Sequence, residues 1–164
     1  MQIGAAYAFA LAGDAAKTQE LAEDVAKRFP DDTLVQSVDL PAIRAQLALN
    51  RHDARKAIEL LQVVIPYELS GNTYPVYRRG EACLVAHQGR EAATEFQKIL
   101  DHRGIVGYDL IGALAHLSFG RAYALSGDKT KAKTAYQDFL ALWKDADPDI
   151  PILKEAKAEY AKLQ

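Results

Sequence analysis

The chain has 164 residues, of which 49% are hydrophobic and 26% charged, an ordinary composition for a globular domain with a sizeable core. Its formal net charge is −2 and its basic residues are scattered, which argues against a general binder of nucleic acid or anionic membranes. The single cysteine, Cys83, excludes an internal disulfide and a cluster of thiolate metal ligands, and its apolar neighbours indicate a small buried core residue.

The first predicted helix is almost entirely apolar, from Ile3 to Ala12. No Lys or Arg precedes it, and the turn Gly13-Asp14 is followed by an amphipathic pattern, so we expect a buried helix and not a signal peptide. No apolar run approaches the roughly 18 residues needed to cross a bilayer. We therefore expect no membrane association and a cytoplasmic location.

Breaks along the chain predict nine helices and no strand. Pro30 ends the second helix, and Pro66 with Ser70-Gly71-Asn72 marks a later break. The remaining breaks lie at residues 50–53, at Gly104 and Gly107, and at 147–151. The most β-like run, residues 63–65, continues the helical register of the residues before it, so a helix is expected there too.

One unit, residues 113–144, combines small and aromatic residues around the turn Gly127-Asp128. Gly120 and Ala132 are placed for close helix approach, and replacing Ala132 with Leu is expected to cost about 1–3 kcal/mol. The turn and its flanking positions recur near Gly13, and weaker copies lie between. The small position on the second helix of each copy is occupied by Thr18, Ala57, Ala92 and Ala132.

The copies are spaced by 39, 35 and 40 residues, against about 34 for a bare helix-pair repeat. The excess falls at residues 31–39 and 101–109, which indicates longer connections or extra helical turns there. Residues 152–163 then form a final helix with apolar positions on one side. Its outer face carries Lys154, Glu155, Lys157, Glu159 and Lys162, which suits an end cap of a repeat array.

The pattern Gly120, Tyr123, Gly127-Asp128, Ala132, Tyr136 and Phe139 resembles the tetratricopeptide repeat (TPR). This resemblance implies an all-α, right-handed superhelix of antiparallel helix pairs with a concave inner face. The units are residues 1–30, 34–66, 73–103 and 109–144, with a capping helix at 150–163, in a single domain spanning 1–164. The first unit is short at its start, which suggests either a longer array or a degenerate first unit.

The two middle units depart from the family pattern, because Arg44 and Arg79 stand where a packing hydrophobe is usual. The tail from Tyr136 onward is also similar to the ends of repeat arrays fused to bacterial serine/threonine kinases and signalling regulators. No kinase motif is present. A regulatory domain of a bacterial protein kinase is therefore one function that the resemblance implies.

No sequence motif indicates catalysis, a cofactor or a metal site. Nucleotide-binding glycine loops, HExxH and GxSxG are all missing from the sequence. His52 and His87 fall at the ends of first helices and His102 at the end of a second helix, where the helix dipole favours them. His116 is expected to pack, and the acidic stretch at residues 145–149 lacks the calcium-loop pattern. An enzyme or small-molecule sensor would need a closed pocket with convergent polar groups, which nothing here predicts.

The concave face is the predicted site, because first-helix residues that pack on neither neighbour should point into it. The expected groove residues are Tyr7, Gln46, Asn50, Tyr74, Tyr77, Glu81, Leu84, Leu117 and Arg121. Aromatic and Arg side chains concentrate binding energy in protein interfaces. An alternative for Tyr74 and Tyr77 is packing beneath residues 70–75. A carboxylate clamp, which some TPR domains use, is not expected, because Arg121 is the one clearly basic position.

The sequence therefore predicts a non-catalytic protein–protein interaction module that binds a peptide or partner protein in its groove, as a piece of a larger signalling protein. The second hypothesis is self-association through an exposed array end, since the apolar first helix leaves an uncovered edge.

Overall fold

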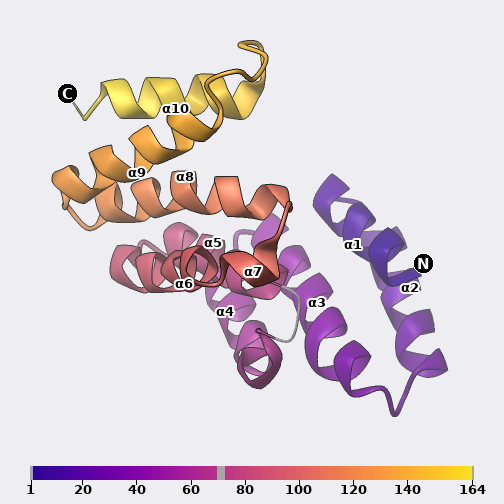
Figure 1. Ribbon diagram of the computed structural model, residues 1–164. Coiled ribbons are helices and arrows are strands. Elements are labelled where there is room, and N and C mark those ends of the chain that lie inside the picture. The colour runs from indigo at the N-terminus through magenta and orange to yellow at the C-terminus, as the bar shows by residue number, and fades with distance from the viewer. Residues whose placement is uncertain (1, 70–72, 164) are drawn as a thin grey trace.

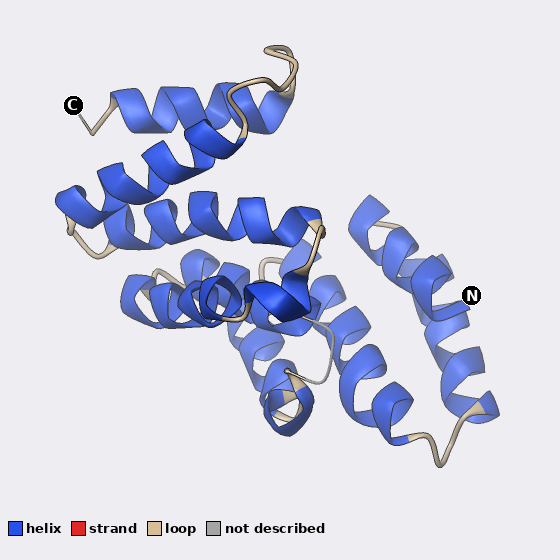
Figure 2. Ribbon diagram, viewed as in Figure 1, coloured by secondary structure: helices blue, strands red, loops and turns tan. Residues whose placement is uncertain are grey.

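The computed structural model describes residues 2–69 and 73–163, and every regular element in these ranges is a helix (Figure 2). The α-helices are α1 (Gln2–Ala12), α2 (Ala15–Arg28), α3 (Leu40–Asn50), α4 (Ala54–Gln62), α5 (Tyr74–Val85), α6 (Gly89–Asp101), α7 (Arg103–Val106), α8 (Leu110–Leu125), α9 (Lys129–Leu142) and α10 (Pro151–Ala161). The all-α prediction is confirmed, and the four-residue α7 comes in addition to the nine predicted helices. The turn expected at residues 70–72 lies outside the described residues.

Consecutive helices pair as four hairpins, α1/α2, α3/α4, α5/α6 and α8/α9. The first helices of the hairpins, α1, α3, α5 and α8, also contact one another in that order. The final helix α10 packs against α9. The array therefore runs from hairpin to hairpin, with the two chain termini far apart (Figure 1).

The four hairpins share one turn geometry. In each, a residue with positive φ ends the first helix, and the next amide donates to a carbonyl five residues earlier, as from Asp128 to Tyr123 at 2.9 Å. The positive-φ residues are Gly13, His52, His87 and Gly127. Glycine adopts this conformation without strain, whereas histidine does so at a cost of about 1–2 kcal/mol. His52 and His87 do lie at first-helix ends, as expected, but as turn residues in the glycine position.

Packing around these turns repeats as well. The predicted small positions, five residues after each turn residue, are all fully buried: Thr18, Ala57, Ala92 and Ala132. Seven residues before each turn residue, a small residue also faces the second helix: Ala6, Ala45, Gly80 and Gly120. A Cβ on Gly80 would come within 2.7 Å of Phe96, and one on Gly120 within 2.9 Å of Tyr136. Glycine is therefore required wherever the facing second helix carries an aromatic ring.

The extra residues in the first long connection form a helical turn of unusual width. Residues 35–39 are π-helical and run directly into α3, with the Leu40 amide donating to the Val35 carbonyl five residues back. Pro41 explains the widening, because a proline ring collides with the carbonyl four residues earlier and has no amide hydrogen to donate. In the second long connection, the extra residues include the short helix α7.

The irregular Arg79 is part of a buried ionic cluster. Its side chain is 3% exposed and bonds to Glu68 and to Glu95 Oε2, the latter at 2.5 Å. Lys98 Nζ lies 3.1 Å from Glu68 Oε1, so two positive and two negative charges balance. Arg44, the other irregular position, is exposed on α3.

The chain from Val63 to Ile65 does not continue helix α4, contrary to the prediction. Helix α4 ends at Gln62, and a 3-10 turn follows at Ile65–Tyr67. Only Val64 of the three is buried. This turn brings Glu68 back toward Arg79, which the helical continuation would not do.

Helix α10 covers the last hairpin, with Leu153 and Ala156 buried against α9. Lys154, Glu155 and Lys157 are exposed, as the end-cap prediction requires. The assignment of Glu159 to the outer face is wrong, because its carboxylate accepts hydrogen bonds from Arg121 Nε at 2.9 Å and from the Tyr136 hydroxyl at 2.8 Å.

Candidate binding face

The first helices α1, α3, α5 and α8 together form one side of the array, here called the first-helix face. It is curved over α3, because Tyr7 of α1 reaches two helices along the row to α5. The ring of Tyr7 lies edge-on to Tyr74, with 6.1 Å between ring centroids. The structure therefore brings together two predicted groove residues that are far apart in sequence.

Arg78 of α5 holds the centre of this curve. Its Nε donates to the Tyr7 hydroxyl at 2.8 Å, and its guanidinium is also hydrogen-bonded to Glu81. The guanidinium carbon lies 5.9 Å from the centroid of the Tyr7 ring and 5.6 Å from that of Tyr77. Burial raises the pKa of Glu81 above its ordinary value, although the charge of Arg78 opposes the rise.

Gln46 and Asn50 lie in the same row on α3 but are used within the protein. Gln46 Nε2 donates to Asn50 Oδ1 at 2.9 Å, and Asn50 Nδ2 donates to the Ala10 carbonyl at 2.6 Å. Gln46 is 8% exposed, and its Oε1 has no hydrogen-bond partner among the described residues. In this arrangement the pair ties α3 to the end of α1.

Tyr77 is buried between α5, α6 and α8. It is 6% exposed, its hydroxyl lies 3.1 Å from Ser118 Oγ, and its ring meets Phe96 edge-on at 5.5 Å. Burial raises the pKa of Tyr77 to about 12. Leu117 is also buried, at 1% exposed, and Leu84 is half-buried. Of these predicted groove residues, Tyr77 and Leu117 offer a partner almost no surface.

Arg121 is paired at the far end of the face. Its Nη2 lies 2.8 Å from Glu159 Oε1 and 3.4 Å from Glu155 Oε2, both on α10. Arg121 therefore anchors the capping helix to α8. The C-terminal part of the first-helix face is thus closed by the protein's own ion pairs.

The N-terminal part of the face exposes a tyrosine ring and a cavity among the described residues. Tyr74 is 37% exposed, and its hydroxyl lies 3.4 Å from Asp109 Oδ1. Beside it is a cavity of about 320 Å³ bounded by helices α1, α3 and α5. The lining residues are Ile3, Gly4, Tyr7, Ala8, Leu11, Asp39, Ala42, Ile43, Tyr74 and Pro75.

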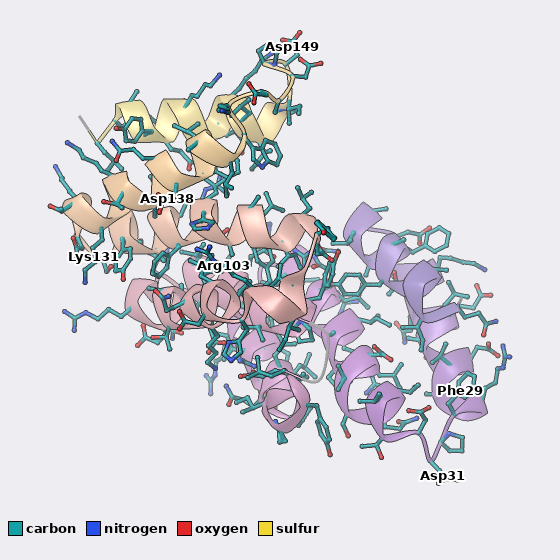
Figure 3. The ribbon with its side chains drawn as sticks, in the orientation of Figure 1. Phe29, Asp31, Arg103, Lys131, Asp138 and Asp149 are labelled. Atoms are coloured by element: carbon teal, nitrogen blue, oxygen red, sulfur yellow. The ribbon has the colours of Figure 1, made fainter. Side chains whose placement is uncertain are left out.

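A larger cavity, of about 680 Å³, lies away from this row of residues, between α6, α7, α8 and α9. Arg103 and Asp138 lie on two sides of it and are labelled in Figure 3. His116 also lines it, with Nδ1 3.9 Å from Asp138 Oδ2. Burial lowers the pKa of His116, and Arg103 adds to this while Asp138 opposes it. The packing of His116 was expected, but its position at a cavity was not.

Sequence reasoning missed Arg78, Asp39 and Ser118. Arg78 had a usable signal, because it lies four residues after Tyr74 and three before Glu81, on one helix face. Asp39 had none, since the spacing of the repeat copies placed it in the long connection at residues 31–39. Ser118 is buried, and a lone serine within an apolar helix carries no distinguishing pattern.

Within residues 2–69 and 73–163, no three His, Cys, Asp or Glu residues are grouped to hold a metal ion. No helix in the same ranges is long and apolar enough to cross a membrane. Comparison with known proteins found no matching family model, curated protein or solved structure.

Proposed function

We propose that this chain is a non-catalytic protein–protein interaction module that binds a peptide or partner protein on the first-helix face. In this proposal the four hairpins are TPR-like units of a right-handed superhelix, and the module acts in the cytoplasm as a piece of a signalling or regulatory protein. The resemblance of the tail to kinase-linked arrays makes a bacterial protein kinase one candidate parent.

The observation that carries the proposal lies in the N-terminal part of the face. Tyr74 presents an exposed ring beside a cavity of about 320 Å³, which is at the small end of the range for ligand sites. Aromatic rings next to apolar pockets supply much of the binding energy in protein interfaces. Elsewhere on the face the charged groups and tyrosine hydroxyls are bonded within the protein. Tyr7 and Glu81 bond to Arg78, Tyr77 to Ser118, and Arg121 to Glu159.

The test is selection of peptides from a displayed random library against the wild-type protein, followed by affinity measurement with variants. Tyr74→Ala is expected to weaken binding of the selected peptides at least about thirtyfold, since anchor residues of this kind are worth about 2 kcal/mol or more. Tyr108→Ala is the matched control, because Tyr108 is fully exposed and lines the larger cavity, which lies away from the face. Tyr77 is unsuitable for this test, since its removal would disturb the core. Selected peptides that bind the Tyr74 variant unchanged would contradict the proposal.

Self-association is a second candidate, favoured by the uncharged helix α1. Phe9 is 37% exposed and Leu11 is 49% exposed on a helix without a single Asp, Glu, Lys or Arg. Exposed apolar surface of this kind often marks an interface. Sedimentation of the wild type and of Leu11→Lys over a range of concentrations distinguishes the two, because a wild type that stays monomeric removes this candidate.

A further inference from the structure

We propose that the cavity between α1, α3 and α5 binds the cationic side chain of a partner peptide, arginine in preference to lysine, with Asp39 as its counter-charge. This inference rests on the proposed function and specifies the chemistry of its ligand. It names one residue of the partner rather than the partner itself.

The described lining of the cavity includes a single carboxylate. Asp39 is its one charged lining residue, and the Asp39 carboxylate makes no hydrogen bond or ion pair within the described residues. Burial raises the pKa of Asp39, and the nearby Asp32 raises it further. A half-buried carboxylate of this kind is stabilised by an opposite charge within about 4–6 Å. The chemistry of the cavity therefore favours a cationic ligand.

The remaining lining is apolar or aromatic. Ile3, Ala8, Leu11, Ala42 and Ile43 offer apolar walls for the aliphatic stem of a long side chain. The rings of Tyr7 and Tyr74 stand at 89° to one another at one end, and aromatic faces attract cations. A planar guanidinium stacks on such rings better than an ammonium does, which is why arginine is preferred.

Arg78 carries the positive charge that lies against Tyr7. Arg78 contacts Tyr7, but it does so at the hydroxyl end of the ring and its charge is balanced by Glu81. Arg78 does not line the cavity. A second cation at Asp39 therefore meets no uncompensated positive charge.

Asp39 lies inside a continuous helix, in the last position of the π-helical stretch that precedes α3. Single π turns are costly and occur often at functional sites. Ala42 and Ile43 follow Asp39 by three and four residues, the spacing at which helical side chains share one face, and all three line the cavity.

The experiment is an NMR titration of the labelled full chain with N-acetyl-arginine amide, with N-acetyl-citrulline amide as the uncharged probe of similar shape. The expected result is saturable shift changes at Ala8, Ala42 and Tyr74 for the arginine probe and binding at least about tenfold weaker for the citrulline probe. Asp39→Asn should weaken arginine binding about tenfold, the equivalent of one lost ion pair in a partly buried site.

Two further variants complete the design. Asp31→Asn, at the outer tip of the connection after α2 (Figure 3), removes one acidic charge outside the cavity and should leave the affinity unchanged. Ala8→Phe fills the cavity without changing charge and should abolish binding.

Three outcomes would each overturn the inference: equal binding of both probes, binding unaffected by Asp39→Asn, or no saturable shifts. A selected peptide that depends on Tyr74 while the arginine probe fails would overturn this inference alone. A probe that binds while no peptide is ever selected would count against the proposed function instead.

Discussion

Arg78 and Arg79 are adjacent on α5, but they point about 100° apart around the helix and meet different surroundings. Arg79 faces the back, where Glu68, Glu95 and the Leu61 carbonyl surround a side chain that is 3% exposed. Arg78 faces the first-helix face, where its side chain is 15% exposed beside Tyr7. One arginine therefore belongs to a buried ionic cluster and the other to a partly exposed surface. The difference is set by the residues that surround each side chain.

The largest expected effect on stability comes from the ionic cluster around Arg79. Replacing Arg79 with Ala leaves Glu68 and Glu95 buried with only Lys98 to balance them, and we expect a loss of about 3–5 kcal/mol in the free energy of unfolding. Urea denaturation followed by circular dichroism measures it. Arg44→Ala is the control, because Arg44 is exposed and its removal should cost less than about 0.5 kcal/mol. Equal losses for the two variants would mean that the cluster does not hold the back of α5 together.

A smaller effect tests the shape of the same side. Gly80→Ala places a Cβ 2.7 Å from the ring of Phe96, and overpacking of this kind costs about 1–3 kcal/mol. Gly4→Ala is the matched control, since no atom lies within 4 Å of its new Cβ and alanine favours the helix by up to about 1 kcal/mol. Thermal melts of both variants should shift in opposite directions. A stabilised Gly80→Ala variant would show that Phe96 is free to move aside.

On the front of α5, the expected cost is lower. Arg78→Ala removes the bonds to Tyr7 and Glu81, and we expect a loss of about 1.5 kcal/mol. Tyr7→Phe removes only the hydroxyl and should cost about 0.5–1.5 kcal/mol. The double variant should lose less than the sum of the two, because both changes break one shared hydrogen bond. Strict additivity would show that the bond between α1 and α5 contributes nothing to stability.

The smallest expected effect is a pair of opposite pH dependences, one from Glu159 on α10 and one from Glu81 on α5. Burial would raise the pKa of Glu159, but hydrogen bonds from Arg121 and Tyr136 outweigh it and lower the pKa below its ordinary value. Its contribution to stability is therefore lost as the pH falls through that lowered pKa. The pKa of Glu81 is raised, so protonation of Glu81 favours the folded state as the pH falls below the raised value.

Unfolding free energies measured from neutral pH to about pH 3 check this pair. Glu159→Gln should flatten the loss of stability on the acid side, whereas Glu81→Gln should steepen it. The same pH profile for both variants would contradict the assigned shifts.

The regular parts of the fold could be predicted because they depend on local chemistry. Gly13 and Gly127 mark turns that need a left-handed residue, and the small residues at Thr18 and Ala132 mark helix contacts that follow from spacing alone. The π-helical stretch could not be predicted, because the collision caused by Pro41 is resolved either by ending a helix or by widening it. The choice depends on packing that only the folded chain supplies.

The sequence could predict which residues of the candidate site lie on the first helices, but not which of them are exposed. Helical register places Tyr7, Tyr74 and Tyr77 on first helices, and the structure does bring Tyr7 and Tyr74 together. Register does not reveal that Ser118 and Phe96 enclose Tyr77, nor that Glu159 engages Arg121. The bonds of Tyr77 to Ser118 and of Arg121 to Glu159 join one hairpin to the next element of the array, which a pattern within one hairpin does not contain.

The fit between small and large residues across each hairpin has a consequence for how such a chain can be rearranged. Gly80 fits against the ring of Phe96 and Gly120 against that of Tyr136. Ala6 and Ala45 share their core clusters with the smaller residues at the equivalent positions, Ala22 and Leu61. A helix moved alone into another hairpin would meet either a void or a collision. The whole hairpin is therefore the smallest interchangeable part of this chain, and crossovers between related genes should be tolerated between hairpins and rejected at their turns.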